Sequence, residues 1–205
     1  MIEAEIKIKI SNKNSIVYLL TEFGYCKDTA EYELDQYYNS TTYNLKSKDM
    51  ALRIREHRLL SIDCETDDVG MIHNQNFLGE CLSTESEAHP HFTLNYKGPK
   101  LDDKTMTREE VEFEIPSYEA GNALLNGLGF KAAGRVEKVR THYTKDDITC
   151  CIDSVTGLGD FLEIEILTDE DKYQNALDRI ETLLGELGYT MQDTVRKSYL
   201  SMLMD

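Results

Sequence analysis

The chain has 205 residues, with 22 Lys and Arg against 38 Asp and Glu and a formal net charge of −16 at pH 7. The hydrophobic fraction of 40 % and the charged fraction of 29 % are typical of a globular protein and argue against a disordered chain. The acidic balance argues against nucleic acid or an anionic membrane surface as a partner, because both attract basic proteins.

Three further features predict a cytoplasmic protein. No apolar run approaches the roughly 20 residues needed to span a bilayer. The chain begins directly with a charged alternation, which leaves no room for a signal peptide. The 5 cysteines form no C-x-x-C pair, so neither a disulfide framework nor a zinc ribbon is expected.

The predicted elements begin with a strand at 3–10, where apolar and charged side chains alternate and so fall on opposite faces. A helix is expected to end near 19–25, because a leucine pair is followed there by a glycine and then an aromatic residue. The same helix ending recurs at 124–130 and 183–189, so a strand–helix–strand unit is repeated. The strand alternation recurs at 52–55, 93–97, 110–115, 138–140, 148–153 and 162–165.

Two segments are predicted to be loops. Residues 61–90 are acidic with little periodicity, and we expect a mobile loop inserted between two strands. Gly157 and Gly159 predict a tight hairpin turn, because the Lys-Ser/Thr ending of a phosphate-binding loop is missing.

The charged strand faces allow two arrangements. They can lie in water on one side of an antiparallel sheet, or helices can cover the apolar side and turn the charges inward around a polar cavity. The second is favoured because acidic and basic strands alternate, with few Ser, Thr or Gln residues between the charges. Such a cavity can hold a divalent metal together with a polyphosphate.

The charged motifs follow one another in a characteristic order. An E-x-E-x-K signature stands at 3–7, followed by LRIR at 52–55, YKGP at 96–99 and REEVE at 108–112. EKVR at 137–140, the segment 153–165 and RKSY at 196–199 complete the series. In this order the sequence resembles the CYTH family, the triphosphate tunnel metalloenzymes that include class IV adenylyl cyclases and thiamine triphosphatases. The resemblance covers nearly the whole chain, as a single domain over 1–205 with an insert at 61–90.

The resemblance implies an α+β fold, a closed antiparallel eight-stranded β-barrel flanked by helices, with the active site inside the tunnel. It implies acidic residues that bind Mg²⁺ or Mn²⁺: Glu3, Glu5, Asp153, Glu163 and Glu165. It also implies cations that grip the triphosphate: Lys7, Arg53, Arg55, Lys97, Lys138, Arg140 and Lys197.

Several roles are more specific. Glu5, Lys7 and Lys97 are the expected catalytic residues. Arg108 is expected either to contact the ligand or to form a salt bridge with Glu110 or Glu112. These acidic neighbours are expected to hold the cations in place, together with Glu114. Four lysines are expected on outer surfaces or at strand ends: Lys9, Lys46, Lys48 and Lys100.

Two reactions are compatible with this set of acidic and basic residues. In a cyclase, the ribose 3′-hydroxyl of ATP attacks its own α-phosphorus and gives cyclic AMP and pyrophosphate. In a hydrolase, water attacks the terminal phosphorus of tripolyphosphate, thiamine triphosphate or a nucleoside triphosphate. The turns at 97–99 and 157–161 are most similar to the cyclase-like branch, which is favoured narrowly. That branch often carries a His-Phe pair before the first strand, whereas this chain has Met1 and Ile2.

A third alternative is a protein that binds triphosphates without cleaving them. The partner expected in every case is a small-molecule triphosphate, with no nucleic acid and no membrane. Family members are often dimeric, so a homodimer is possible.

Overall fold

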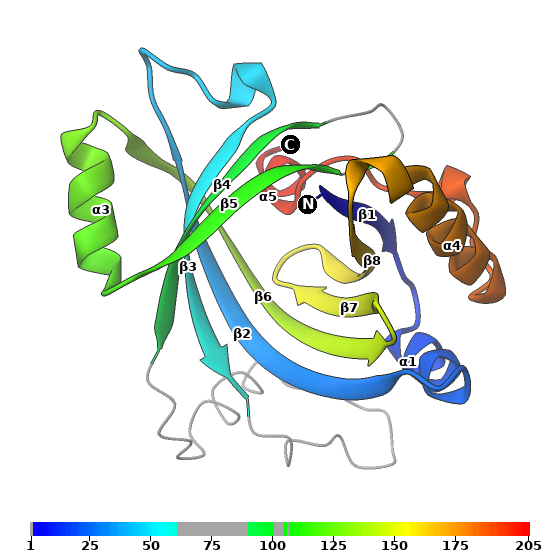
Figure 1. Cartoon of the computed structure of the whole chain (residues 1–205). Helices are drawn as coiled ribbons and strands as arrows, with labels where there is room; N and C mark the ends of the chain where they lie inside the picture. Colours follow the sequence, from blue (N-terminus) through cyan, green and yellow to red (C-terminus); the bar gives the residue numbers. More distant parts are fainter. Residues whose placement is uncertain (1, 61–89, 101–104, 106) are drawn as a thin grey trace.

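The fold is known from a computed structural model that describes residues 2–60, 90–100, 105 and 107–205. The loop expected at 61–90 therefore lies, apart from Pro90, outside the described residues. Eight antiparallel strands form one sheet with the order β1-β8-β7-β6-β2-β3-β4-β5, and the sheet curls around a concave face (Figure 1). The strands are β1 (Ile2–Lys9), β2 (Cys26–Asn39), β3 (Ala51–Leu59), β4 (His91–Lys100), β5 (Arg108–Ile115), β6 (Lys131–Lys145), β7 (Ile148–Val155) and β8 (Gly159–Thr168).

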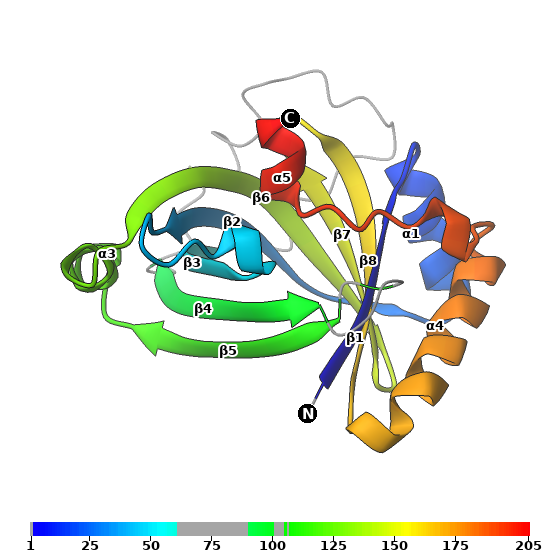
Figure 2. The ribbon, with the colours of Figure 1, turned by 90° about the horizontal axis from the view of Figure 1, so that it is seen from above.

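Four α-helices are found in the described part of the chain, and three of them pack on the convex side of the sheet. Figure 2 shows α1 and α4 together at one side of the molecule and α3 at the other, while α5 lies close to β6. No helix in the described ranges is long and apolar enough to cross a membrane. The helices are α1 (Lys13–Glu22), α3 (Tyr118–Gly127), α4 (Tyr173–Glu186) and α5 (Tyr199–Met204).

The apolar faces of the alternating strands supply the core, except on β5, where Val111 and Phe113 are 48 % and 53 % exposed. Ile6, Ile164 and Ile152 pack in one cluster with Leu20 of α1 and Ile180 of α4, and all five side chains are essentially inaccessible to solvent. Burying such an aliphatic side chain contributes roughly 1.5–3 kcal/mol relative to leaving it exposed. The outward apolar faces are therefore held by the helices, and the charged faces turn inward, as the sequence predicts.

The helix endings predicted from the leucine–glycine–aromatic pattern are confirmed. Gly24, Gly129 and Gly188 have φ angles of 83°, 88° and 85°, a left-handed conformation that residues with a Cβ adopt at a cost. After each glycine the aromatic N–H reaches back to the helix, as in the 2.9 Å bond from Tyr25 to the Leu20 carbonyl. The glycine pair at 157 and 159 also has positive φ and forms the turn between β7 and β8.

The expectation of a closed barrel is not confirmed. β1 and β5 are the two edges of the sheet, and no strand pairing between them is found among the described residues. The two edges approach each other where the Glu5 N–H donates to the Thr107 hydroxyl over 3.2 Å. Because the acceptor here is a side-chain oxygen and not the carbonyl of a paired strand, the two edges are not joined as neighbouring strands. The sheet is therefore a curled half-barrel.

Candidate functional site

A pocket of about 560 Å³ occupies the concave face of the sheet. Its charged walls come from β1, β3, β4, β5, β6 and β8, because each contributes the charged side of its alternation, and the end of β2 also lines it. The segment 196–201 and Met204 close one side. Every site residue predicted from the sequence except Asp153 lines this pocket: Glu3, Glu5, Lys7, Arg53, Arg55, Lys97, Arg108, Lys138, Arg140, Glu163, Glu165 and Lys197.

One wall of the pocket is a carboxylate cluster formed by Glu3, Glu5 and Glu110. One oxygen from each lies within 4.8 Å of the others, although β1 and β5 are opposite edges of the sheet. Burial, followed by the charge of Glu165, raises the pKa of Glu3 to about 8. Burial, followed by the charge of Glu163, raises the pKa of Glu5 to about 7.

These raised pKa values indicate that the surrounding protein compensates the negative charge of the ionised cluster only in part. Hard oxygen donors that approach closely in a buried position are what Mg²⁺ and Mn²⁺ prefer. The residues therefore fit a hard divalent cation. Burial also raises the pKa of Glu165, which faces the same region. Glu110 is the member that sequence reasoning did not assign to the metal.

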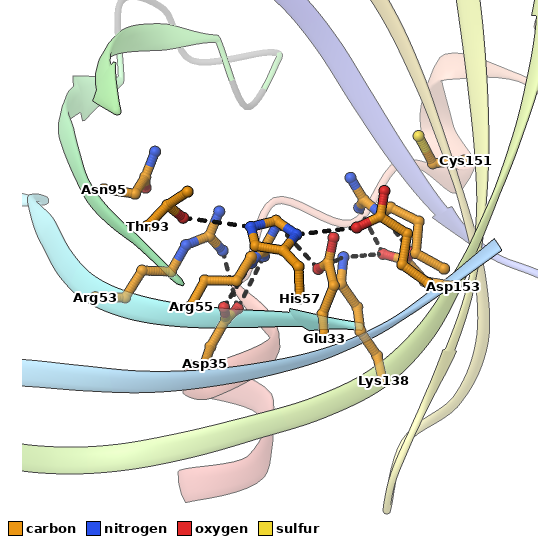
Figure 3. A network of polar contacts seen from close by, with 12 residues as sticks. Glu33, Asp35, Arg53, Arg55, His57, Thr93, Asn95, Lys138, Cys151 and Asp153 are labelled. Atoms are coloured by element: carbon orange, nitrogen blue, oxygen red, sulfur yellow. Dashed lines mark hydrogen bonds and ion pairs between the residues drawn. The ribbon is translucent and has the colours of Figure 1, made fainter. Parts of the chain in front are cut away.

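The opposite wall consists of cations that are held by buried carboxylates (Figure 3). Asp35 lies directly across from Arg55 in the β2–β3 register and binds its guanidinium through two bonds of 2.6 and 2.9 Å. The same carboxylate accepts a bond from Arg53 over 2.9 Å. Glu33 lies 2.9 Å from Arg55 and 3.2 Å from Lys138. Fixed in this way, the cations keep their positions without a ligand.

Glu33 and Asp35 are functional residues that the sequence reasoning missed. Both are 2 % exposed. Burial acts to raise the pKa of both carboxylates, but neighbouring cations outweigh it. Arg55 and Lys138 lower the pKa of Glu33 to about 2. Arg53 and Arg55 lower the pKa of Asp35. The signal was present, because acidic residues occupy alternate positions at 31–35.

Asp153 differs from the other predicted metal ligands. It is 0 % exposed, and its oxygens lie 2.8 Å from Lys138 and 2.6 Å from Arg140. The Tyr199 hydroxyl donates to it over 2.9 Å. Against the effect of burial, Arg140 and Lys138 lower its pKa to about 2. The structure thus places Asp153 behind the cations, in the position of an anchor.

Glu163 and Glu165 stand between the two walls. Glu163 pairs with Arg140 and lies 3.7 Å from Lys7, while Glu165 lies 3.5 Å from Arg140. Against burial, Arg140 lowers the pKa of Glu163 to about 2. The two β8 carboxylates therefore contact cations on one side and lie near Glu3 and Glu5 on the other.

The two predicted catalytic lysines have opposite electrostatic environments. Burial lowers the pKa of Lys7, which is 2 % exposed. Burial also acts to lower the pKa of Lys97, but the paired Glu110 carboxylate outweighs it, and the pKa is raised. Glu110 thus holds a cation in place, as the sequence predicts for this strand.

Several basic residues lie at the rim of the pocket. Arg108 donates to the backbone carbonyls of Gly98 and Asp49 over 3.1 and 3.2 Å, a role that was not anticipated. Lys197 lines the pocket at its rim, where its side chain is 67 % exposed and pairs with Asp205. Lys100 lies at the end of β4 and Lys46 is exposed, as expected, but both also line the pocket. The curl of the sheet brings them there, which strand alternation alone does not reveal.

The same pocket has an apolar section. Tyr37, Leu45 and Met50 line it from β2 and the segment before β3, and Leu200 and Met204 line it from α5. A ligand that carries an apolar or aromatic group besides its charges therefore finds both kinds of surface in one pocket.

Comparison with known proteins agrees with this geometry. Residues 1–199 match the CYTH domain. A protein of Methanocaldococcus jannaschii named "Putative adenylate cyclase MJ0240" is 33 % identical over 203 residues, covering 98 % of each chain. The structure of PH1819 from Pyrococcus horikoshii OT3 is 31 % identical with a TM-score of 0.77, covering 98 % of both chains.

A more distant structure shares the fold. The Hippeastrum protein HpAC1, described as having a dominant triphosphatase activity, is 18 % identical with a TM-score of 0.62, covering 98 % of this chain and 95 % of that one. The domain match spans nearly the whole length, and the identity to the M. jannaschii protein extends from end to end. The chain therefore belongs to the CYTH family.

Proposed function

We propose that the protein is a metal-dependent enzyme that acts on a triphosphate inside the concave pocket, and that its reaction is the conversion of ATP to cyclic AMP and pyrophosphate. One observation carries this proposal. A cluster of three carboxylates faces a wall of buried cations across a single pocket of about 560 Å³. A simple anion-binding protein has no use for the carboxylates, whereas a metal–triphosphate complex matches both walls.

The cations bind the substrate phosphates in this proposal. Arg53, Arg55 and Arg140 present guanidinium groups suited to bidentate contacts with phosphate oxygens, and Lys138 adds a point charge. Because Asp35, Glu33 and Asp153 hold these groups in place, little reorganisation is needed as charge develops in the transition state.

The metal would be held by Glu3, Glu5 and Glu110, with Glu163 and Glu165 within reach of the same region. When bound, Mg²⁺ or Mn²⁺ supplies charge neutralisation on the phosphates and lowers the pKa of the attacking hydroxyl. Asp153, which is fully buried behind Lys138 and Arg140, acts through these cations and not as a ligand.

Cyclisation forms one bond to the α-phosphorus and breaks another. The 3′-oxygen forms a bond to the α-phosphorus, the bond from the α-phosphorus to the bridging oxygen breaks, and pyrophosphate leaves with the electron pair. The hydroxyl proton must be taken up. Lys7 is the group best suited to accept it, in the form of its neutral amine, because burial lowers its pKa. The pKa of Lys97 is raised, so Lys97 stays charged and neutralises the phosphates.

The apolar section supports a nucleotide over a bare polyphosphate. Tyr37, Leu45 and Met50 offer contacts to a nucleoside and none to inorganic tripolyphosphate. The second candidate is a triphosphatase, in which water attacks the terminal phosphorus. It is favoured by the predominance of phosphate-binding cations in the pocket, which would grip tripolyphosphate or thiamine triphosphate equally well.

A product assay separates these reactions. The protein is incubated with ATP, tripolyphosphate or thiamine triphosphate in Mg²⁺ or Mn²⁺, and cyclic AMP, pyrophosphate and phosphate are quantified. Cyclic AMP and pyrophosphate in equal amounts support cyclisation. Phosphate without cyclic AMP overturns it in favour of hydrolysis, and ligand binding without any product overturns both. The Glu5→Gln variant should abolish product, whereas Glu114→Gln, whose side chain is 80 % exposed, should not.

A further inference from the structure

A second group of metal-ligating side chains lies outside the pocket. Glu31 and Glu33 project from β2, His57 from β3 and His142 from β6, and none of the four lines the pocket. One donor atom each from Glu31, Glu33 and His57 lies within 4.8 Å of the others. Figure 3 shows His57 close to Glu33 and Arg55, and Arg55 lines the pocket.

The two imidazoles converge on one carboxylate. His57 Nδ1 lies 2.9 Å from Glu31 Oε2, and His142 Nε2 lies 3.5 Å from Glu31 Oε1. The side chains of His57, Glu31 and His142 are 20 %, 19 % and 23 % exposed, so the group can be reached from solvent. Its donors thus form a compact cluster of mixed nitrogen and oxygen character.

Each imidazole is oriented by a contact at its other nitrogen. His57 Nε2 lies 3.3 Å from the Thr93 hydroxyl, and His142 Nδ1 lies 3.5 Å from the Cys151 sulfur. When the ring N–H is directed to these partners, His57 Nδ1 and His142 Nε2 present lone pairs to the cluster. Metal-binding histidines are typically fixed in this manner by a hydrogen-bond acceptor behind the ring.

One buried nitrogen in the group lacks a hydrogen bond within the described structure. Nε2 of His142 is buried, and its contact with Glu31 Oε1 is 3.5 Å long. Buried polar atoms normally find a closer partner. Oε2 of Glu33 differs, because it is ion-paired with Arg55 over 2.9 Å and with Lys138 over 3.2 Å.

We propose that Glu31, Glu33 and His57, with His142 as a fourth donor beside Glu31, bind a transition-metal dication of the Zn²⁺ class. Imidazole nitrogen favours Zn²⁺, Co²⁺, Ni²⁺ or Cu²⁺, whereas Mg²⁺ and Ca²⁺ favour all-oxygen sites. The donor set therefore distinguishes this site from the carboxylate cluster of Glu3, Glu5 and Glu110. An ion here would join β2, β3 and β6 behind the cation wall.

The proposal is tested by titrating metal-free protein with Co²⁺ in the presence of excess Mg²⁺. The Mg²⁺ is added to fill the carboxylate cluster. The expected result is visible absorption of tetrahedral intensity that saturates near one equivalent, and displacement of Co²⁺ by Zn²⁺. His57→Gln and His142→Gln should each weaken Zn²⁺ binding by at least about 10-fold, as measured by calorimetry. A wild-type protein that shows no Co²⁺ band and no Zn²⁺ binding overturns the proposal, whatever the stability of the variants.

Two controls locate the ion. His91 lies directly across from His57 in the β3–β4 register but pairs with Glu114, so His91→Gln should leave Zn²⁺ binding unchanged. Glu5→Gln should also leave it unchanged, because Glu5 belongs to the other cluster. Loss of Zn²⁺ binding in Glu5→Gln would overturn the second site. Unaltered binding in both His57→Gln and His142→Gln would leave a metal-free His–Glu–His network as the role of these residues.

Discussion

Tyr199 donates its hydroxyl to Asp153 over 2.9 Å, while Lys7 Nζ lies 4.3 Å from the centre of the same ring. A residue at the start of α5 is thereby tied to β7 and to β1, and it is only 7 % exposed. Because Asp153 also binds Lys138 and Arg140, the single hydroxyl fixes the carboxylate that holds two pocket cations. The C-terminal segment is thus part of the site.

Tyr199→Phe removes the hydroxyl and keeps the ring beside Lys7. A hydrogen bond to a charged group contributes about 1.5–3 kcal/mol, so the free energy of unfolding should fall by this amount in urea titrations. The KM for the triphosphate should rise, because Lys138 and Arg140 lose an anchor of their partner. Tyr18→Phe, on a side chain that is 63 % exposed, is the control. A KM unchanged in Tyr199→Phe would contradict the positioning role.

The buried carboxylate of Asp35 should make the free energy of unfolding depend on pH. Burial raises and Arg53 and Arg55 lower its pKa, and the net shift is downward. Below pH 4 the folded protein therefore binds fewer protons here than the unfolded chain. The stabilisation is full above the unfolded pKa of about 3.9 and is lost as pH falls toward the folded pKa.

Asp35→Asn removes this contribution and leaves two buried guanidinium groups uncompensated. The free energy of unfolding should fall by about 3–5 kcal/mol at neutral pH, measured by urea denaturation. The difference from the wild type should narrow as pH is lowered from about 4 to about 2. Asp28→Asn, at an exposed position of the same strand, should change stability by less than about 0.5 kcal/mol. A difference independent of pH would show that the Asp35 charge is not responsible.

The pairing of Asp35 shows which features can be predicted from the sequence and which cannot. Alternation within β1 and β8 indicates which side chains share a face, and the leucine–glycine–aromatic pattern indicates where helices end, because both are properties of neighbouring residues. The pairing of Asp35 with Arg55 depends instead on the register of β2 against β3. That register is set by the packing of the whole sheet and cannot be predicted from the sequence of either strand alone.

The same reasoning applies to the carboxylate cluster. Glu3 and Glu5 are evident from the first strand, but Glu110 meets them only because the sheet curls until its two edges approach each other. The placement of Asp153 has a similar origin. Its inward face is predictable, whereas its burial under Tyr199 depends on the path of the C-terminal segment.

Glu5→Gln tests the carboxylate cluster directly. The change keeps the volume of the side chain and removes one negative charge, so Mn²⁺ should no longer raise the melting temperature measured by calorimetry. Activity should fall with it. The metal-free variant should be at least as stable as the wild type, because burial and Glu163 disfavour the Glu5 charge. A Mn²⁺-dependent rise equal to that of the wild type would exclude Glu5 as a ligand.

A substitution at Gly121 in α3 tests the packing of this helix against β3, the strand that carries Arg53 and Arg55 of the cation wall. A Cβ at this position would lie 2.6 Å from Ile115 Cδ1 and 2.8 Å from Ile54 Cδ1, closer than carbon atoms can pack. Because Ile54 neighbours Arg53 and Arg55 on β3, displacement of this side chain would also shift the cation wall. Gly121→Ala should therefore lower the free energy of unfolding by about 1–3 kcal/mol.

Gly185 in α4 is the matched control, since a Cβ there meets nothing within 4 Å. Gly185→Ala should raise the free energy of unfolding by about 0.5–1 kcal/mol, because alanine loses less backbone entropy in a helix than glycine does. Opposite signs for two glycine-to-alanine changes in helices, measured by urea denaturation, would separate close packing from helix propensity. If both variants were stabilised, α3 would not pack against β3 and β5 as closely as described.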